Sequence, residues 1–253
     1  VRALVDSIRL VRRRRPAVVV ALGGFASAAC ALAAVIWRVP LVLMEQNARA
    51  GASNRLVARF AKACAVPFPD TDLPRAVVTG NPVRDEVLAV AADRDVAAAR
   101  ERLGIDPDRT MIVVFAGSLG SRRINEATFG VARTLSGRDD LAIRHVIGAR
   151  DWDDREQVDT DGLDYVQVRY EHDMATVLAA ADLAVCRAGG TTVAELAAIG
   201  VGSILVPLPI ATRDHQTANA QPLVRAGAAV LVPDDQLDAV RLADELTAIV
   251  DAP

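Results

Sequence analysis

Residues 181–200 combine a strand pattern, a glycine turn and a helix pattern in one short segment. Residues 183–185 form an apolar run typical of a buried strand, and residues 193–199 contain good helix formers. Gly189 and Gly190 between them can adopt backbone angles that other residues resist. A helix beginning at such a turn points its first N–H groups and positive dipole end out of the sheet, which suits a phosphate or diphosphate. The segment therefore predicts an α/β unit with a ligand site at its turn.

Glu195 has two interpretations within this segment. Thr191 or Thr192 can cap the helix, and Thr192 together with Glu195 has the spacing of a capping box, in which the carboxylate bonds back to the helix start. A carboxylate one turn into such a helix can instead accept the hydroxyl groups of a ribose. The residues alone leave both interpretations open.

The same rhythm recurs along the chain. Residues 17–22 predict a strand, broken by glycine before a helix over 27–37, and residues 110–116 predict another strand. The glycine turn after residue 116 lacks the full G-x-G-x-x-G fingerprint, so it supports NAD only weakly. The charged, helical stretch 85–109 predicts a domain junction, and 253 residues suffice for two α/β domains.

Further elements follow from apolar runs. Residues 40–44 and 76–79 predict strands, and residues 54–63 predict a helix. The first of these strands delivers Glu45, Gln46 and Asn47 to the edge at which open parallel sheets bind ligands.

Residues 16–37 contain no charged side chain, so a transmembrane span and a signal peptide are alternatives to the strand and helix. The glycine break after a β-branched run favours the strand and helix. Residues 1–15 place apolar side chains at helical spacing among arginines. This pattern fits a helix packed on its own sheet with a solvated end, or a basic rim resting on anionic lipid.

Composition excludes several classes of function. The net charge of −3 gives no global field that favours nucleic acid. Cys30, Cys64 and Cys186 are scattered and have no paired spacing, which indicates reduced cytosolic thiols and no disulfide scaffold or metal site. The chain opens on Val1 without a methionine, so we expect it to be truncated.

Several stretches, in order along the chain, resemble a single family of bacterial enzymes. They are residues 23–27 (GGFAS), 45–48 (EQNA), 79–84 (TGNPVR), 117–121 (GSLGS), 187–195 (RAGGTTVAE) and 214–220 (DHQTANA). The chain resembles the MurG type of inverting glycosyltransferase, which adds N-acetylglucosamine to the lipid-linked muramyl-pentapeptide of cell-wall synthesis. The resemblance implies a GT-B fold of two Rossmann-like domains. Residues 1–82 would be a partial acceptor domain facing the membrane, and residues 83–253 the domain that binds UDP-N-acetylglucosamine.

The resemblance also implies roles in the nucleotide site. Glu195 would accept the ribose hydroxyls, and Ser118 and Arg84 would reach the phosphates. The diphosphate and its flanks would lie on the start of the same helix, at Gly190, Thr191, Thr192 and Val193. No cofactor or metal is implied.

The remaining implied contacts lie outside that helix. Glu171 stands where the family usually has an aliphatic residue whose backbone reads uracil. Gln216 would bind the sugar hydroxyls, and Asn47 would contact the donor from the other domain. Gly23 and Gly24 would form the second glycine loop of the acceptor domain.

The implied partners are UDP-N-acetylglucosamine, the undecaprenyl-linked muramyl-pentapeptide and an anionic membrane surface. The membrane contact would use Arg12, Arg13, Arg14 and Arg15, as in a peripheral enzyme on the cytoplasmic face of the bacterial plasma membrane. No nucleic acid is implied.

Two departures from the family pattern bear on activity. The family's first glycine loop, with the histidine often proposed as catalytic base, would lie upstream of Val1, which leaves the base of this chain unknown. The C-terminal helix that returns to the first domain would lie beyond the other end. We therefore expect donor binding without turnover, as in a UDP-sugar-binding module. A UDP-N-acetylglucosamine 2-epimerase on the same fold is a further alternative.

Overall fold

The structure is a computed structural model that describes residues 2–252. It divides into two compact units. Unit 1 comprises Val1–Pro82 with Ile210–Asn219, and unit 2 comprises Val83–Pro209 with Ala220–Pro253. Each unit is built on a parallel sheet, which confirms the predicted α/β class.

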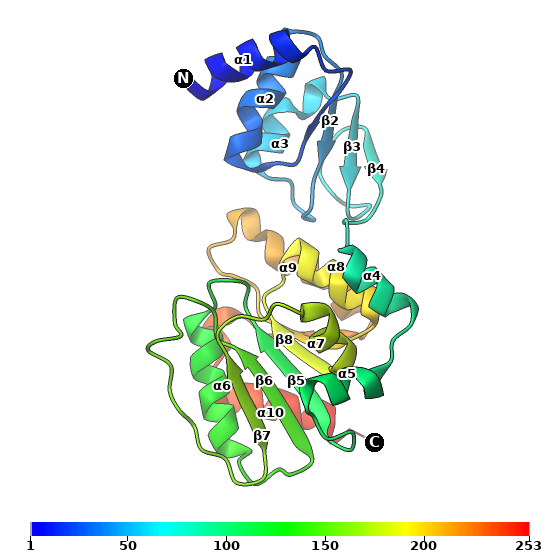
Figure 1. Cartoon of the computed structure of the whole chain (residues 1–253). Helices are drawn as coiled ribbons and strands as arrows, with labels where there is room; N and C mark the ends of the chain where they lie inside the picture. Colours follow the sequence, from blue (N-terminus) through cyan, green and yellow to red (C-terminus); the bar gives the residue numbers. More distant parts are fainter. Residues whose placement is uncertain (1, 253) are drawn as a thin grey trace. The chain divides into compact units, whose positions relative to one another are not determined.

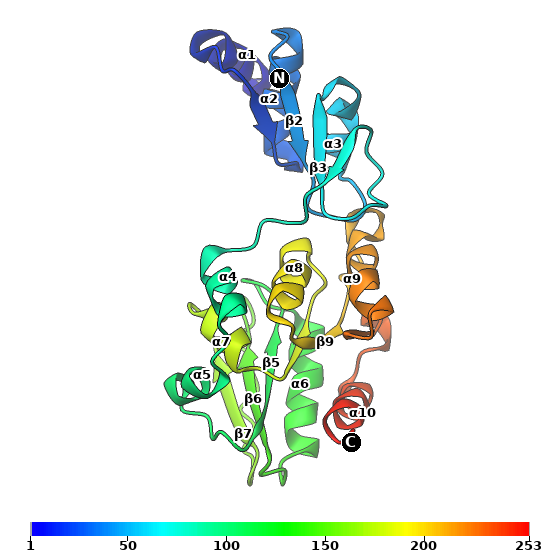
Figure 2. The same ribbon diagram turned by 90° about the vertical axis from the view of Figure 1, so that its right-hand side faces the viewer.

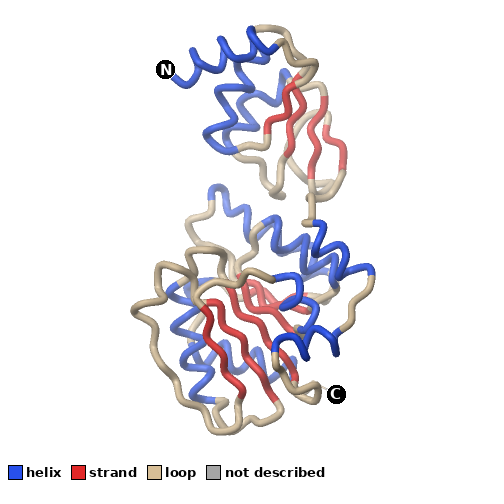
Figure 3. Tube along the Cα trace, in the orientation of Figure 1, coloured by secondary structure: helices blue, strands red, loops and turns tan. Residues whose placement is uncertain are grey.

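Unit 1 contains a parallel sheet of four strands in the order β1-β2-β3-β4 (Figure 3). Its strands are β1 (Val19–Ala21), β2 (Leu41–Met44), β3 (Ala63–Val66) and β4 (Ala76–Val78). Its helices include α1 (Arg2–Arg14), α2 (Gly24–Ile36) and α3 (Ala52–Val57). Leu41 and Leu43 are fully buried, whereas the residues between and after them are half-buried, as the two-residue strand period requires. This alternation turns the leucines toward the face of the sheet that α2 and α3 cover.

The uncharged stretch 16–37 folds as strand β1, a glycine break and helix α2. This confirms the favoured interpretation, although the helix begins at Gly24 rather than at Ser27. The transmembrane alternative is wrong for this stretch because the break divides it into two short elements. Within residues 2–252, none of the helices combines the length and the apolar character that a membrane crossing needs.

The predicted helix 54–63 is partly wrong. Helix α3 begins earlier, a 3-10 turn covers Ala58–Phe60, and Ala63 already opens strand β3. Strand β3 reads Ala-Cys-Ala-Val, a pattern too weakly β-branched to mark a strand by itself. Its register between β2 and β4 makes it a central strand, which only long-range pairing could decide.

Residues 210–219 group with unit 1, although the sequence assigned them to the second domain. Arg213 forms an ion pair with Asp72 at 2.8 Å. The Asn219 side-chain oxygen accepts a hydrogen bond of 2.7 Å from the backbone N–H of Ala48. Both partners are far away in the sequence, so no local pattern could reveal them.

Unit 2 contains a parallel sheet of six strands in the order β10-β9-β8-β5-β6-β7 (Figure 1). Its strands are β5 (Thr110–Phe115), β6 (Leu141–Val146), β7 (Asp164–Val168), β8 (Leu183–Cys186), β9 (Gly202–Leu205) and β10 (Ala229–Leu231). Counted from β5, this is the dinucleotide-fold order 3-2-1-4-5-6, read from the other edge. Strand order reverses between β5 and β8, so the crevice at their carboxyl ends is the expected binding position.

Helices cover both faces of this sheet (Figure 2). They are α4 (Asp85–Ala92), α5 (Val96–Leu103), α6 (Arg122–Thr134), α7 (Met174–Ala180), α8 (Gly190–Ile199) and α10 (Ala239–Val250), while α9 (His215–Arg225) crosses from unit 1 into unit 2. Met111 and Val113 of β5 belong to the core layer under α7 and α8. Ile112 and Val114 belong to the layer under α6 and α10. Burial on both faces explains the uninterrupted apolar run of β5.

His145 lies in β6 and is fully buried. Its Nε2 is 3.0 Å from the Asn125 side-chain oxygen, and its Nδ1 is 2.8 Å from the Tyr165 hydroxyl. The Asn125 amide nitrogen donates to the Ile147 carbonyl, so the Asn125 oxygen is the atom that accepts from Nε2–H. Burial lowers the pKa of His145 to about 3, and the ring is therefore neutral near pH 7.

We predict that His145 makes unit 2 sensitive to acid. The unfolded chain binds this proton near the ordinary pKa of 6.5, whereas the folded chain does so only near 3, so stability is lost as pH falls between these values. The group contributes a slope of up to about 1.4 kcal/mol per pH unit. Denaturant unfolding of wild type and His145→Gln from pH 7 to pH 4 should show a shallower slope in the variant. Equal slopes for wild type and His145→Gln would contradict the prediction.

Candidate functional site

Strands β5 and β8 place two loops at one edge of the unit 2 sheet. Their last residues, Phe115 and Cys186, are paired partners in the parallel ladder. The turn 117–121 therefore begins beside residues 187–190. The predicted site residues Ser118 and Gly190 belong to these two neighbouring loops. Tertiary pairing thus brings together stretches that are about 70 residues apart in the sequence.

The turn after β5 is fixed by close backbone packing. Gly120 has φ +79°, and a Cβ on it would come within 2.0 Å of the Ile147 carbonyl oxygen. The Ser118 carbonyl accepts a hydrogen bond of 3.1 Å from the N–H of Ala149. Ser118 itself is exposed at this closely packed turn.

Arg187 ties the loops of this sheet edge together, and it was not among the predicted site residues. Its Nη2 donates a 2.7 Å hydrogen bond to the hydroxyl of Ser121. Its Nη1 donates to the carbonyls of Val206 and Pro207, at 3.2 and 3.1 Å, and lies 2.5 Å from the Asp234 carboxylate. A planar guanidinium is suited to holding several oxygens at fixed angles. The sequence signal that could have identified Arg187 is its position directly after the buried strand β8.

Helix α8 begins at Gly190 with Gly189 as its N-cap, and no side chain makes a capping hydrogen bond there. The prediction that Thr191 or Thr192 caps the helix is therefore wrong. Gly189 has the extended backbone of an N-cap, so the helix begins at Gly190. Both threonines therefore lie inside its first turn. The Val193 N–H donates to the Gly189 carbonyl at 2.9 Å, which closes the first turn.

Glu195 lies one turn into α8 and is buried. Its Oε1 accepts a 2.7 Å hydrogen bond from Nε of Arg84, which is the residue directly before α4. This hydrogen bond raises the pKa of Arg84, so the guanidinium stays charged. The capping-box interpretation is wrong, since the N-cap is Gly189 rather than Thr192 and no side chain makes a capping hydrogen bond. The predicted residues Arg84 and Glu195, which are 111 positions apart, are in direct contact.

Glu171 supports the loop between β7 and α7. Its carboxylate forms an ion pair of 2.8 Å with Arg144 and accepts a 3.0 Å hydrogen bond from the N–H of Asp173. Asp173 in turn caps α7 through the N–H of Thr176. The Glu171 side chain is thus engaged within the protein.

Four predicted residues lie in unit 1. Asn47 follows β2, and its side-chain oxygen accepts a 3.1 Å hydrogen bond from the Asn219 amide. Gln216 lies in the first turn of α9, on the segment that groups with unit 1. Gly23 and Gly24 have φ +82° and +74°, and a Cβ on Gly23 would lie 3.1 Å from the Asn54 amide nitrogen. Both positions favour glycine for its conformation, and at Gly23 the space beside Asn54 is also tight.

Within residues 2–252, no group of three His, Cys, Asp or Glu side chains is arranged to hold a metal ion. The titratable groups at the described site are instead paired with each other.

Comparison with known proteins places these features in a family. Residues 111–253 match the glycosyltransferase family 28 C-terminal domain, and residues 1–66 match the N-terminal domain of that family. A UDP-N-acetylglucosamine–N-acetylmuramyl-(pentapeptide) pyrophosphoryl-undecaprenol N-acetylglucosamine transferase from Alkalilimnicola ehrlichii is 42% identical, over 100% of this chain and 70% of that protein. The crystal structure of MurG from Acinetobacter baumannii is similar with a TM-score of 0.79 and 28% identity, over 98% of this chain and 69% of that one.

A UDP-GlcNAc 2-epimerase from Neisseria meningitidis, bound to UDP-GlcNAc, is similar with a TM-score of 0.72. The superposition covers 99% of this chain and 72% of the epimerase chain. At 14% identity, this likeness shows a shared fold and nothing about function. The neighbours confirm the predicted GT-B type of architecture. The chain belongs to glycosyltransferase family 28, within its MurG type.

Proposed function

We propose that this chain transfers N-acetylglucosamine from UDP-N-acetylglucosamine to undecaprenyl-linked N-acetylmuramyl-pentapeptide in peptidoglycan synthesis. Its membership of the MurG type supports this activity. The structural observation that carries the proposal is Glu195, a buried carboxylate one turn into a glycine-led helix at the switch point of the unit 2 sheet. A nucleoside diphosphate offers both groups that such a position recognises, namely phosphates and ribose hydroxyls.

The nucleotide contacts are assigned on this basis. The first turn of α8, from Gly190 to Val193 with both threonine hydroxyls, holds the diphosphate. Helix N–H groups and the positive dipole end favour an anion there. Ser118 reaches the phosphates from the adjacent rigid turn. The backbone at Glu171 reads the uracil, while Gln216 and Asn47 contact the sugar.

Arg84 and Glu195 exchange partners in this proposal. The ion pair joins them at 2.7 Å, and the Arg84 side chain is 44% exposed, so it can turn toward an incoming diphosphate. Glu195 then accepts the ribose hydroxyls in place of the guanidinium. Each group thereby keeps a charge-assisted hydrogen bond in both states, which limits the cost of leaving a charge unpaired.

The reaction is a single inverting displacement. The 4-hydroxyl of the acceptor sugar attacks the anomeric carbon of N-acetylglucosamine, its proton passes to a base, and the bond between that carbon and the UDP oxygen breaks. Negative charge develops on the leaving diphosphate. The α8 dipole and Arg84 stabilise that charge, which is how preorganised donors lower such a barrier. Gly23 and Gly24 form the acceptor loop.

Transfer itself can be measured directly. Labelled UDP-N-acetylglucosamine and a lipid-linked muramyl-pentapeptide are incubated with the purified chain. The similarity to the transferases extends over the whole chain. We therefore expect label in the lipid fraction and UDP release only when the acceptor is present, in place of the donor binding without turnover that the sequence alone led us to expect. Conversion of the sugar nucleotide without acceptor would instead identify a 2-epimerase. Binding without either product would identify a UDP-sugar-binding module.

The ribose role of Glu195 predicts a loss of nucleotide affinity in Glu195→Ala. Hydrogen bonds to a charged group contribute about 1.5 to 3 kcal/mol, so UDP should bind about 10- to 150-fold more weakly in calorimetric titration. Glu86→Ala is the matched control, because Glu86 also pairs with Arg84, at 3.4 Å, but is 59% exposed. Its UDP affinity should equal that of wild type. An unchanged affinity in a folded Glu195→Ala protein would remove the ribose role.

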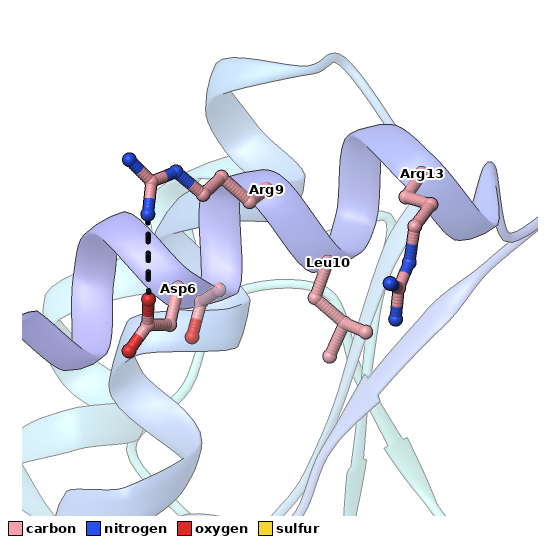
Figure 4. A pocket seen from close by; sticks show the side chains of 5 residues that line it. Asp6, Arg9, Leu10 and Arg13 are labelled. Atoms are coloured by element: carbon pink, nitrogen blue, oxygen red, sulfur yellow. Dashed lines mark ion pairs between the residues drawn. The ribbon is translucent and has the colours of Figure 1, made fainter.

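Helix α1 supports peripheral contact with the cytoplasmic face of the bacterial plasma membrane. Leu10 is 44% exposed and points to the same side of the helix as Arg13, beside the ion pair of Arg9 with Asp6 (Figure 4). The Arg12 guanidinium lies 5.5 Å from the ring centroid of Trp37. Exposed apolar side chains among arginines suit the interface of an anionic bilayer.

We predict that replacing Arg12, Arg13, Arg14 and Arg15 with glutamine removes most binding to anionic liposomes. Each arginine near such a surface contributes about 1 kcal/mol. Cosedimentation should also fall with added salt, since the Debye length shrinks from about 10 Å at 0.1 M to about 3 Å at 1 M. A control with the same charge change replaces four exposed arginines of unit 2, Arg102, Arg133, Arg150 and Arg241. Equal loss of binding in the two variants would reject α1 as the membrane contact.

A further inference from the structure

Glu45 is a buried carboxylate at the end of β2 that the proposed reaction does not use. Its Oε1 accepts hydrogen bonds from the backbone N–H groups of Gln46 and Asn47, both at 3.0 Å, and from the Asn47 side-chain amide at 3.1 Å. Its Oε2 accepts from the N–H of Gly51 at 3.0 Å and from the Asn54 amide at 2.9 Å. One side chain therefore holds both ends of the loop 46–51.

These contacts occupy every hydrogen-bond acceptor position of the Glu45 carboxylate. A carboxylate offers about four lone-pair sites, and here two oxygens receive five N–H donors. No lone pair remains to take a proton from an acceptor hydroxyl. Glu45 is therefore unsuited to the part of general base, although it lies beside Asn47.

Asn54 extends the same network to the acceptor loop. It is 1% exposed and also donates from its amide nitrogen to the Met44 carbonyl at 3.3 Å. The same nitrogen would lie 3.1 Å from a Cβ at Gly23. Asn54 thus packs under Gly23 and also donates a hydrogen bond to Glu45. The position of the glycine loop at Gly23 therefore depends on the position of the loop 46–51.

We infer that Glu45 is a positioning residue that presets the loop 46–51, aims Asn47 at the donor sugar and, through Asn54, couples this loop to Gly23. The assignment of Asn47 to the sugar rests on the proposed function. The presetting of the loop rests on the hydrogen bonds alone. A loop held in place before binding spares the ligand the entropic cost of ordering it.

The test compares Glu45→Gln with wild type in two measurements. The amide that replaces the carboxylate places its NH2 group against N–H donors in either orientation, at Gly51 and Asn54 or at Gln46 and Asn47. Hydrogen exchange of residues 46–51, followed by mass spectrometry, should therefore be faster by about tenfold or more. Calorimetric titrations with UDP and UDP-N-acetylglucosamine should show that the ratio of the affinity for the sugar nucleotide to the affinity for UDP is lower than in wild type. Affinity for UDP itself should stay within about twofold, because charge-assisted contacts in unit 2 determine it.

Three further variants make the result specific. Asp70→Asn makes the same change of charge at an exposed site of unit 1 and should match wild type in both measurements. The double variant Glu45→Gln with Asn54→Asp gives the introduced amide an acceptor again and should slow exchange in part. If Glu45→Gln does not fold, Glu45→Asp keeps the charge but shortens its reach, and it should show the same two losses.

The two claims fail separately. Unchanged exchange and an unchanged affinity ratio in a folded Glu45→Gln protein would overturn the positioning role. Faster exchange with an unchanged ratio would show that Glu45 sets the loop but that the loop does not present Asn47 to the sugar, which also overturns the inference. Absence of UDP binding by wild type would overturn the proposed function, and the exchange measurement would still decide whether Glu45 holds the loop.

Discussion

The parallel pairing of β5 with β8 is the interaction on which the rest of unit 2 depends. From β5 the following strands are added on one side of the sheet, and from β8 on the other side. The helices that follow β5 and β8 therefore pack on opposite faces, and the two loops diverge at the edge of the sheet. Arg187 then fixes the separated loops, because it binds Ser121 on one side and the end of β9 on the other. Strand order and one guanidinium thus set the positions of the loops at this edge of the sheet.

In each unit, ionised side chains hold candidate site residues in place. In unit 2, Glu195 is paired with Arg84, so neither the buried carboxylate nor the cation is left without a partner. In unit 1, Glu45 uses both oxygens to accept from N–H groups of the loop that it precedes. The two acids are used differently. Glu195 is held by the side chain of Arg84, which is 44% exposed, whereas Glu45 is held largely by backbone N–H groups of its own loop.

The sequence was most informative where local chemistry repeats. The strand, glycine and helix units placed most elements correctly, and the ordered stretches from Gly23 to residue 220 indicated the family. Predictions were wrong where the local sequence fits more than one structure. At Glu195 the spacing satisfied a capping box, but the glycine before the helix already served as N-cap and left the acid available to Arg84. At β3 a short alanine-rich run had too little pattern to distinguish strand from helix.

The sequence by itself determined the α/β class and the glycine turns, and it supplied the residues of the proposed nucleotide site, because these depend on neighbours in the chain and on backbone freedom at glycine. Only the tertiary structure decided that residues 210–219 belong with unit 1, that Arg84 meets Glu195 and that Glu45 holds its loop by both ends. The first two join positions more than a hundred residues apart, and the third needs the loop's actual path. Periodicity carries no information on such contacts, since they arise only when the sheets fix where each strand ends.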